Sequence, residues 1–386
     1  MPSRSQDLLA ALLAFPSITR QSNLDLIHWA RKLLESHGIT CQLVHDETGT
    51  KANLFASVGP ADQAGVMLSG HTDVVPVEGE HWTVAPFDAT VKDGRIFGRG
   101  AADMKGFVAC ALSAMIEAAS RPLKRPLQLA LSYDEEIGCV GVRRLLDLLE
   151  SMPSRPMLCV VGEPTSMRVA VGHKGKMAMR AVCCGREAHS SLAPTVLNAI
   201  HLACDFAHDL RKEQASLQTF GAHDGDYDIP YTTIHVGLFN GGTALNIVPN
   251  RCTIDFEVRH LASDDPAVLA ERLQELASQR VRRLHDAQRP EADIALTILN
   301  AYPGLDTHPL SEGVEWVQSL LPGSEPPIKV AYGTEGGLFT QRLSTPVVVC
   351  GPGSIDQAHK PDEYVDIDQL DRCDDFLREL CVTLEW

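Results

Sequence analysis

The chain has 386 residues, of which 44% are hydrophobic and 22% are charged, a composition typical of a globular protein with an apolar core and long enough for two domains. Its 34 Lys and Arg residues against 50 Asp and Glu residues give a formal net charge of −16. This negative balance argues against nucleic acid or an anionic membrane surface as a partner.

The first part of the chain alternates helical and strand patterns. Some segments repeat apolar residues at helical spacing, and other short apolar runs lie between polar turns, as buried strands do. The predicted helices are 5–15, 23–36, 104–119 and 140–151, and the predicted strands are 66–69, 127–133 and 157–161. A further buried strand is predicted at 347–350. We therefore expect an α/β fold with a sheet covered by helices on both faces.

The pattern changes between about residues 177 and 301. The predicted strands here are 176–184, 232–238, 251–259 and 294–300, and the predicted helices are 194–213 and 269–283. Two helices on one antiparallel sheet would accommodate these elements. We therefore predict an inserted α+β domain at 177–301, within a catalytic domain made of 1–176 and 302–386.

Five separate loop motifs contain side chains of the kinds that bind divalent metal ions. The candidate ligands are His71 in GHTD, Asp103 in GAADMKG, Glu136 in DEEIG, Glu163 in VGEPT and His359 in AHKPDEY. Carboxylates and imidazoles without a thiolate suit a catalytic zinc, cobalt or manganese ion better than a structural zinc cage. Most of these motifs follow predicted strands, and open α/β sheets bind ligands beyond the carboxyl ends of their strands. The sequence therefore predicts that the five side chains converge.

Each motif also has an ordinary interpretation when it is taken alone. The HTD segment reads as a turn with a solvated histidine, and the run from Asp134 to Glu136 reads as a solvated acidic turn. Residues 98–103, GRGAAD, imitate a dinucleotide-binding fingerprint, but the charge of Asp103 at the sixth position would repel a pyrophosphate. We reject that interpretation.

Together, the motifs and their order resemble the aminoacylase, glutamate carboxypeptidase and acetylornithine deacetylase family of di-zinc hydrolases, from near Leu8 to the C-terminus. The stretches GEPTS, GHKG and GPGSIDQAHKPDEY are most similar to the deacetylase branch. The resemblance implies a zinc-peptidase-like catalytic domain with two divalent metal ions per subunit, zinc first and cobalt as the alternative. It implies that Asp103 bridges the ions, that His71 and Glu163 bind one, and that Glu136 and His359 bind the other.

The resemblance also implies roles for neighbours of the ligands. Glu135 would be the general base that passes a proton from water to the leaving amine. Asp73 would orient the imidazole of His71 from outside the ligand set. A cis peptide bond is expected before Met104.

Further candidates concern the substrate and the inserted domain, which the resemblance makes a dimerisation or lid domain. His189 would reach into the partner subunit's site and stabilise an oxyanion, and Asn246 would contact the substrate. The guanidinium of Arg259 is a candidate for a substrate carboxylate. Glu335, in YGTEGG, is a candidate for a substrate ammonium group. A surface arginine and a turn with a solvated glutamate are the ordinary alternatives for the last two.

The function implied by the resemblance is that of a homodimeric, metal-dependent amidohydrolase acting on small N-acyl amino acids. A desuccinylase, a dipeptidase and a broad N-acyl-amino-acid hydrolase remain alternatives. A catalytically silent metal-binding or partner-binding protein on the same fold is the alternative from another class. The complete set of motifs, including Glu135, favours an enzyme.

Whole-chain features predict a cytoplasmic protein. The sequence contains no run of about 20 apolar residues that would span a membrane. The N-terminal stretch MPSRSQDLLAALLAF has an Asp inside its apolar part and no small-residue cleavage site, so we expect no signal peptide. The eleven Cys residues are scattered without a CxxC pair, as is typical of thiols in a reducing compartment.

Overall fold

The computed structural model describes residues 3–323 and 325–386, which belong to two compact units. Unit 1 comprises Met1–Gly172, Leu305–Val330 and Thr334–Trp386, and unit 2 comprises His173–Gly304 and Ala331–Gly333. Most of unit 2 is thus a single insertion within the sequence of unit 1. The bounds predicted from the sequence for an inserted domain, 177–301, remain a prediction. The dimerisation or lid role of that domain remains a prediction as well.

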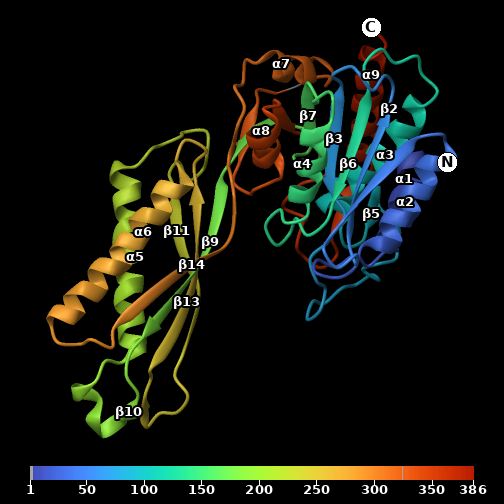
Figure 1. Ribbon diagram of the computed structural model, residues 1–386. Helices are drawn as coiled ribbons and strands as arrows, with labels where there is room; N and C mark the ends of the chain where they lie inside the picture. The colour runs from blue at the N-terminus through green and yellow to red at the C-terminus, as the bar shows by residue number, and fades with distance from the viewer. Residues whose placement is uncertain (1–2, 324) are drawn as a thin grey trace. The chain divides into compact units, whose positions relative to one another are not determined.

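A nine-stranded mixed sheet forms the centre of unit 1 (Figure 1). Its strands are β1 (Thr40–His45), β2 (Ala52–Val58), β3 (Val66–His71), β6 (Leu127–Ser132), β7 (Leu158–Val161), β8 (Ala170–His173), β15 (Leu305–Asp306), β16 (Ile328–Val330) and β17 (Val347–Val349). The order is β1-β2-β6-β3-β7-β17-β8-β15, with β16 paired to β8. Strands β6, β3, β7 and β17 run parallel to one another, whereas β1 and β2 are antiparallel additions at one edge.

Helices cover both faces of this sheet. They are α1 (Arg4–Leu13), α2 (Leu24–Ser36), α3 (Gly106–Ala118), α4 (Val142–Ser151), α7 (Glu312–Ser319), α8 (Gly336–Leu343) and α9 (Ile367–Thr383). Helix α3 packs on β2, β3 and β6, and α1 and α9 pack on α3. Alternate residues of β6, Leu127, Leu129 and Leu131, join α3 in the main apolar core, because successive side chains of a strand point to opposite faces.

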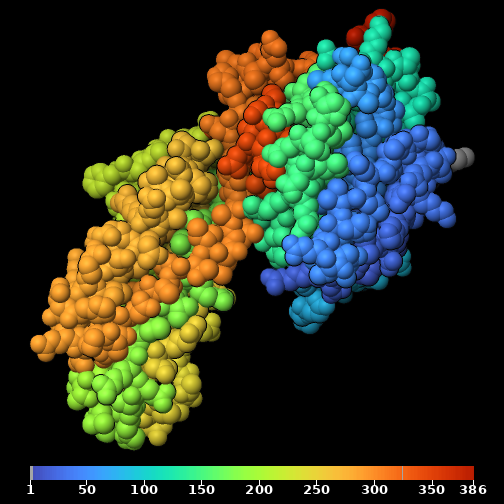
Figure 2. Space-filling view, viewed as in Figure 1, coloured from blue at the N-terminus to red at the C-terminus, as the bar shows by residue number. Residues whose placement is uncertain are grey.

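Helices α4 and α8 lie against each other and against the sheet, and they are exposed side by side in the space-filling view (Figure 2). The α/β fold class predicted from the sequence is therefore confirmed.

A small sheet of β4 (Thr90–Lys92), β5 (Arg95–Phe97) and β18 (Tyr364–Asp366) joins two distant parts of the chain, because β18 pairs with β5.

Unit 2 is built on a four-stranded antiparallel sheet of order β11-β13-β9-β14. Its elements are β9 (Gly175–Cys184), β10 (Ala188–His189), α5 (Ala199–Phe220), β11 (Thr233–Gly241), β12 (Ile247–Val248), β13 (Arg251–His260), α6 (Pro266–Asp286) and β14 (Asp293–Tyr302). Alternate side chains of β9, among them Met177 and Met179, are buried in a second apolar core with α5 and α6. The opposite face of β9 is partly exposed.

One helix boundary differs from the sequence prediction. Helix α5 begins at Ala199 and not near Pro194, because residues 190–195 form a separate short turn. The side chain of Asn198 caps the helix by accepting the backbone N–H groups of Ile200 at 2.8 Å and His201 at 3.3 Å. An Asn cap satisfies backbone donors that the first helical turn leaves free.

Among the residues that the structure describes, no helix combines the length and the apolar character needed to cross a membrane.

Candidate metal centre and active site

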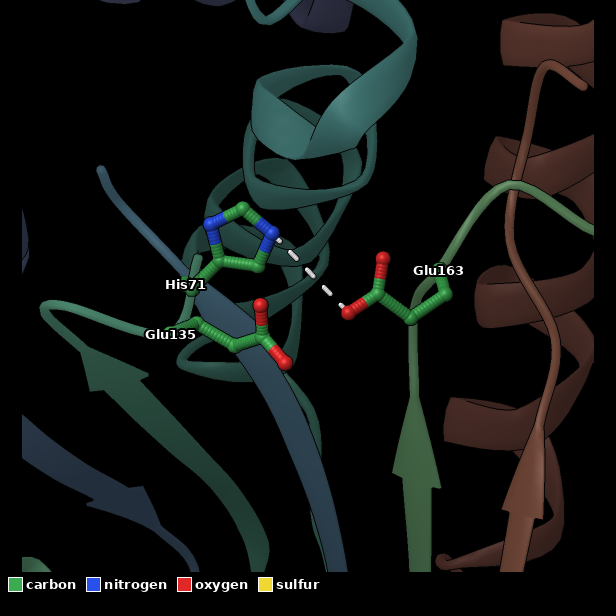
Figure 3. Close-up of side chains that lie close together, drawn as sticks. All are labelled: His71, Glu135 and Glu163. Carbon is green, nitrogen blue, oxygen red and sulfur yellow. Dashed lines mark ion pairs between the residues drawn. The ribbon is translucent and has the colours of Figure 1, made fainter. Parts of the chain in front are cut away.

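The parallel strands of unit 1 bring several predicted site residues to one edge of the sheet. His71 is the last residue of β3, Glu135 and Glu136 follow β6, and Glu163 follows β7. Because neighbouring parallel strands end at the same edge, their following loops converge there. Figure 3 shows the side chains of His71, Glu135 and Glu163 directed toward one another.

Asp103 lies between the two predicted histidine ligands. Its Oδ1 is 3.0 Å from His71 Nε2, and its Oδ2 is 3.2 Å from His359 Nε2. Glu163 Oε1 is 3.9 Å from His71 Nε2, and Glu136 Oε1 is 3.1 Å from His359 Nε2. We call these five residues the ligand cluster. Each oxygen of Asp103 therefore lies near a different histidine.

This donor set fits divalent metal ions. Among the residues that the structure describes, two groups have ligand atoms that all lie within 4.8 Å of one another. One is His71, Asp103 and Glu136, and the other is His71, Glu135 and Glu163. The mixture of imidazole and carboxylate without thiolate is typical of catalytic ions. The Nδ1 of His71 lies 2.9 Å from the backbone oxygen of Asp73, which leaves Nε2 directed at the cluster, as in ligating histidines.

Burial and neighbouring charges shift the pKa values of Glu135 and of residues in the ligand cluster. Burial raises the pKa of Glu135 to about 8, with His71 opposing the rise. Burial and the adjacent Asp103 carboxylate raise the pKa of Glu163 well above its usual value. Hydrogen bonding to Asp103 raises the pKa of His359 to about 10, with a second carboxylate contributing. Metal ligands must be deprotonated, so binding of cations here would release protons.

Asp73 has a contact that the sequence did not predict. Its carboxylate accepts the backbone N–H of Glu135 at 3.0 Å and that of Glu136 at 3.3 Å. The imidazole of His71 is hydrogen-bonded to the backbone oxygen of Asp73, whereas the Asp73 Oδ1 is 3.6 Å from the ring nitrogen. The carboxylate of Asp73 thus contacts the turn after β6 in addition to lying near the imidazole of His71.

Glu335 lies close to β3, the strand that ends at His71. Its side chain is 1% exposed, and the hydroxyl of Ser69, two residues before His71 on β3, donates to its Oε2 at 3.5 Å. Burial raises the pKa of Glu335 to about 7, although a hydrogen bond with Ser132 opposes the rise. A carboxylate with this little exposed surface does not present itself to a substrate ammonium, so the burial does not support the interpretation made from the sequence.

The remaining predicted residues belong to unit 2. His189 is exposed at the end of β10, with its Nδ1 2.8 Å from Ser191 Oγ. Asn246 is also exposed. It lies beside His189 because its backbone oxygen accepts the N–H of the next residue, Ser190, at 2.9 Å. Unit 2 thus brings His189 and Asn246 together at the small two-stranded sheet of β10 and β12.

Arg259 lies on β13 in unit 2, held by two polar neighbours. Its Nε donates to Glu257 Oε1 at 2.9 Å, and its Nη1 donates to the hydroxyl of Tyr302 at 3.1 Å. Neither neighbour was predicted from the sequence, since Tyr302 reaches Arg259 only through the pairing of β13 and β14 with β9. The guanidinium is therefore held in place on the partly exposed face of the sheet.

The expected cis peptide bond is present between Asp103 and Met104.

Comparison of the sequence with known proteins finds relatives along nearly the whole chain. Residues 67–383 match the profile described as Peptidase family M20/M25/M40. The chain is 32% identical over 371 residues to an acetylornithine deacetylase from Myxococcus xanthus, covering 95% of this chain and 93% of that protein. It is 34% identical over 375 residues to an acetylornithine deacetylase from Shigella sonnei (strain Ss046), covering 93% and 92%.

Comparison of the structure with solved structures finds the same fold. An M20 family metallo-carboxypeptidase from Sulfolobus solfataricus aligns with a TM-score of 0.80 at 20% identity, covering 100% of both chains. A tripeptidase from Staphylococcus aureus aligns with a TM-score of 0.76 at 20% identity, covering 99% of this chain and 98% of that chain. A dinuclear metal-binding M20 peptidase from Bacillus subtilis aligns with a TM-score of 0.70 at 15% identity, covering 98% and 97%.

Proposed function

Since this chain belongs to the peptidase family M20/M25/M40 and is a metal-dependent amidohydrolase, we propose that it cleaves N-acetyl-L-ornithine to L-ornithine and acetate. The observation that carries this choice of substrate is the similarity, over more than nine-tenths of the chain, to two proteins named acetylornithine deacetylase. We assign the reaction to arginine biosynthesis in the cytoplasm. The cysteines, all free in the described chain, suit such a reducing compartment.

The ligand cluster would hold two divalent metal ions. We assign His71 and Glu163 to one ion, Glu136 and His359 to the other, and Asp103 to both. The two oxygens of Asp103, each facing a different histidine, support this division. Zinc is the first choice and cobalt the second. When bound, such a pair of ions polarises a substrate carbonyl and lowers the pKa of the attacking water.

Glu135 would move the proton during the reaction. We propose that its carboxylate accepts a proton from the attacking water and then donates it to the leaving amine of ornithine. The backbone of Glu135 is held by Asp73, and its side chain points toward His71 (Figure 3). A group whose pKa lies near neutrality suits both acceptance and donation of a proton. Burial raises the pKa of Glu135, and the bound cations would act in the opposite direction.

Three residues of unit 2 would bind the substrate. We assign the α-carboxylate of acetylornithine to Arg259, whose guanidinium is the charged group best suited to a carboxylate. His189 would stabilise the oxyanion that forms on the oxygen of the acetyl carbonyl group, acting in the site of the partner subunit. Asn246, beside His189 at the small sheet of β10 and β12, would contact the substrate.

A homodimer is therefore part of the proposal. Strand β11 is at one end of the described sheet of unit 2 and exposes the apolar side chains of Leu238 (58%) and Phe239 (41%). An exposed edge strand with apolar residues offers unpaired backbone groups and apolar surface to another chain. We propose that a second copy of this protein covers it.

The rival substrates differ in the groups that flank the amide bond. Succinyl-diaminopimelate adds an acidic acyl group, acetylmethionine lacks the side-chain ammonium, and a dipeptide replaces the acetyl group. Purified protein supplied with zinc or cobalt should give the highest kcat/KM with acetylornithine. A higher kcat/KM with one of the other three would replace the proposed substrate with that one.

A further inference from the structure

A buried ion pair lies beside the loops that contain Asp103 and His359. The Nη1 of Arg99 donates to Glu363 Oε2 at 2.9 Å, and both side chains are 1% exposed. Arg99 is four residues before Asp103, and Glu363 is four residues after His359. The pair therefore joins two loops of unit 1 that are distant in sequence and that both contribute to the ligand cluster.

The second oxygen of Glu363 holds the Asp103 loop directly. Oε1 accepts the backbone N–H of Ala102 at 3.0 Å and that of Asp103 itself at 3.1 Å. Each oxygen of this carboxylate is thus used, one by Arg99 and the other by the backbone that carries the candidate bridging residue. Charge-assisted hydrogen bonds of this kind fix both distance and direction.

The side chain of Arg99 is in turn held by a contact with the loop that contains His359. Its Nη1 also donates to the backbone oxygen of Lys360, the residue after His359, at 3.2 Å. Its Nη2 donates to Glu80 at 2.5 Å, and its guanidinium carbon lies 5.0 Å from the centre of the Trp82 ring. The guanidinium therefore connects the His359 loop to the Glu363 carboxylate.

We propose that Arg99 and Glu363 are positioning residues that set the spacing between Asp103 and His359 and thereby the affinity of the site for its metal pair. This inference rests on the proposed function, because it takes those two side chains as metal ligands. Burying an ion pair carries a desolvation penalty that its mutual attraction often fails to exceed. Stability alone is therefore a weak reason for a pair that makes contacts with both ligand loops.

The structure also indicates that the Asp103 loop keeps other anchors when Glu363 is changed. The Nζ of Lys105 donates to the backbone oxygens of Leu12 at 3.1 Å and Phe15 at 2.7 Å. The backbone N–H of Lys105 donates to the oxygen of Gly100 at 2.8 Å. Loss of the Glu363 contacts should therefore misalign Asp103 without releasing the loop.

The test is Glu363→Gln, with zinc titrated into the metal-free protein by calorimetry. An amide has one acceptor oxygen and one donor nitrogen, so it cannot accept from Arg99 and from both backbone N–H groups at once. We expect the weaker of the two zinc-binding steps to lose about 10–100-fold in affinity, the usual effect of removing a partner outside the ligand set. The visible absorption spectrum of the cobalt-loaded protein should also change, because it reports on the coordination geometry.

The matched control is Asp366→Asn, which breaks the exposed pair of Arg95 and Asp366 on the neighbouring strands β5 and β18. That pair has a 2.9 Å contact with side chains 42% and 49% exposed, and its loss should leave both zinc affinities unchanged. If Glu363→Gln does not fold, Arg99→Lys decides the question. The lysine keeps the positive charge but cannot reach Glu363, Lys360 and Glu80 together. Arg99→Lys should therefore also reduce the affinity of the weaker zinc-binding step.

Each outcome has a separate meaning. If the unaltered protein binds two zinc ions and the folded variants bind them with the same affinities, the positioning role is wrong and the metal centre stands. A lower melting temperature with unchanged zinc affinities would make the pair merely structural. If the unaltered protein binds fewer than two ions, the proposed metal centre itself fails, and this inference fails with it.

Discussion

The carboxylate of Asp73 holds the backbone of Glu135, with Oδ1 accepting its N–H at 3.0 Å. The backbone oxygen of the same Asp73 contacts the Nδ1 of His71 at 2.9 Å. One residue therefore sets the geometry of a candidate metal ligand and of the candidate base, through two different groups.

The first prediction follows from this division of contacts. Asp73→Asn keeps the backbone contact with His71 but loses one of the two acceptors for the turn that carries Glu135. We expect kcat for acetylornithine to fall about 10–100-fold, with KM nearly unchanged and two metal ions still bound. Steady-state kinetics and metal analysis check this, with the exposed Asp62→Asn as the control. A loss of metal would mean that Asp73 acts mainly through His71.

Metal removal is the second prediction. The ligand cluster contains only imidazole and carboxylate donors, so a chelator should abolish hydrolysis of acetylornithine, and added zinc or cobalt should restore it. Elemental analysis of each sample must accompany the rate measurement. Full activity in a sample shown to be free of metal would refute the assignment of the cluster.

The third prediction separates a base from a ligand at neighbouring positions. Glu135→Gln should retain both metal ions and lose on the order of 10²–10⁴-fold in rate, because only proton transfer is removed. The comparison variant is Glu163→Gln, which should instead weaken metal binding. This comparison matters because Glu135 and Glu163 both lie in one group with His71. Halved metal content in Glu135→Gln would make Glu135 a ligand.

The fourth prediction concerns action across the proposed dimer. His189→Ala and Glu135→Gln subunits, each inactive alone, should regain activity when they are mixed. One site of the mixed dimer would then combine an intact Glu135 with an intact His189 from the other subunit. Sedimentation should first establish that mixed dimers form. Mixed dimers without activity would show that His189 does not act in the partner's site.

The fifth prediction uses the burial of Glu335. Because this side chain is 1% exposed, Glu335→Gln should lower kcat/KM for acetylornithine and for acetylmethionine by the same factor. A direct contact with the ornithine ammonium would behave differently. Loss of such a charge-assisted bond changes affinity by about 10–100-fold for the substrate that has the ammonium and leaves the other unaffected.

The central strands were predictable because of their burial. The predicted strands 66–69, 127–133 and 157–161 correspond to β3, β6 and β7, whose residues are buried along their length. Such strands have continuous apolar runs, which are easily recognised. Strand β1 was not predicted, because it is partly exposed along its length and its sequence, TCQLVH, mixes polar and apolar residues.

Helix α9 was also missed, although its sequence contains a usable signal. Its buried residues include Leu370, Cys373, Leu377 and Leu380, which have helical spacing. Many charged residues between them hide the pattern from a search for apolar runs.

The loop motifs identified side chains that the structure brings within contact distance, because their chemistry is local to each motif. The contacts of Glu363 could not be predicted in this way. These contacts form only because β18 pairs with β5, which brings together segments as distant in the sequence as Arg95 and Asp366.

The strand order of unit 1 has a consequence for folding during synthesis. Strand β17 lies between β7 and β8 in the sheet, although almost the whole chain must leave the ribosome before residues 347–349 are available. Unit 2 is nearly continuous in sequence, so its sheet can form while that gap in the sheet of unit 1 is still open. Domains generally fold as units during synthesis. His359 emerges later still, so a chain that terminates early should lack a complete metal site even when unit 2 has folded.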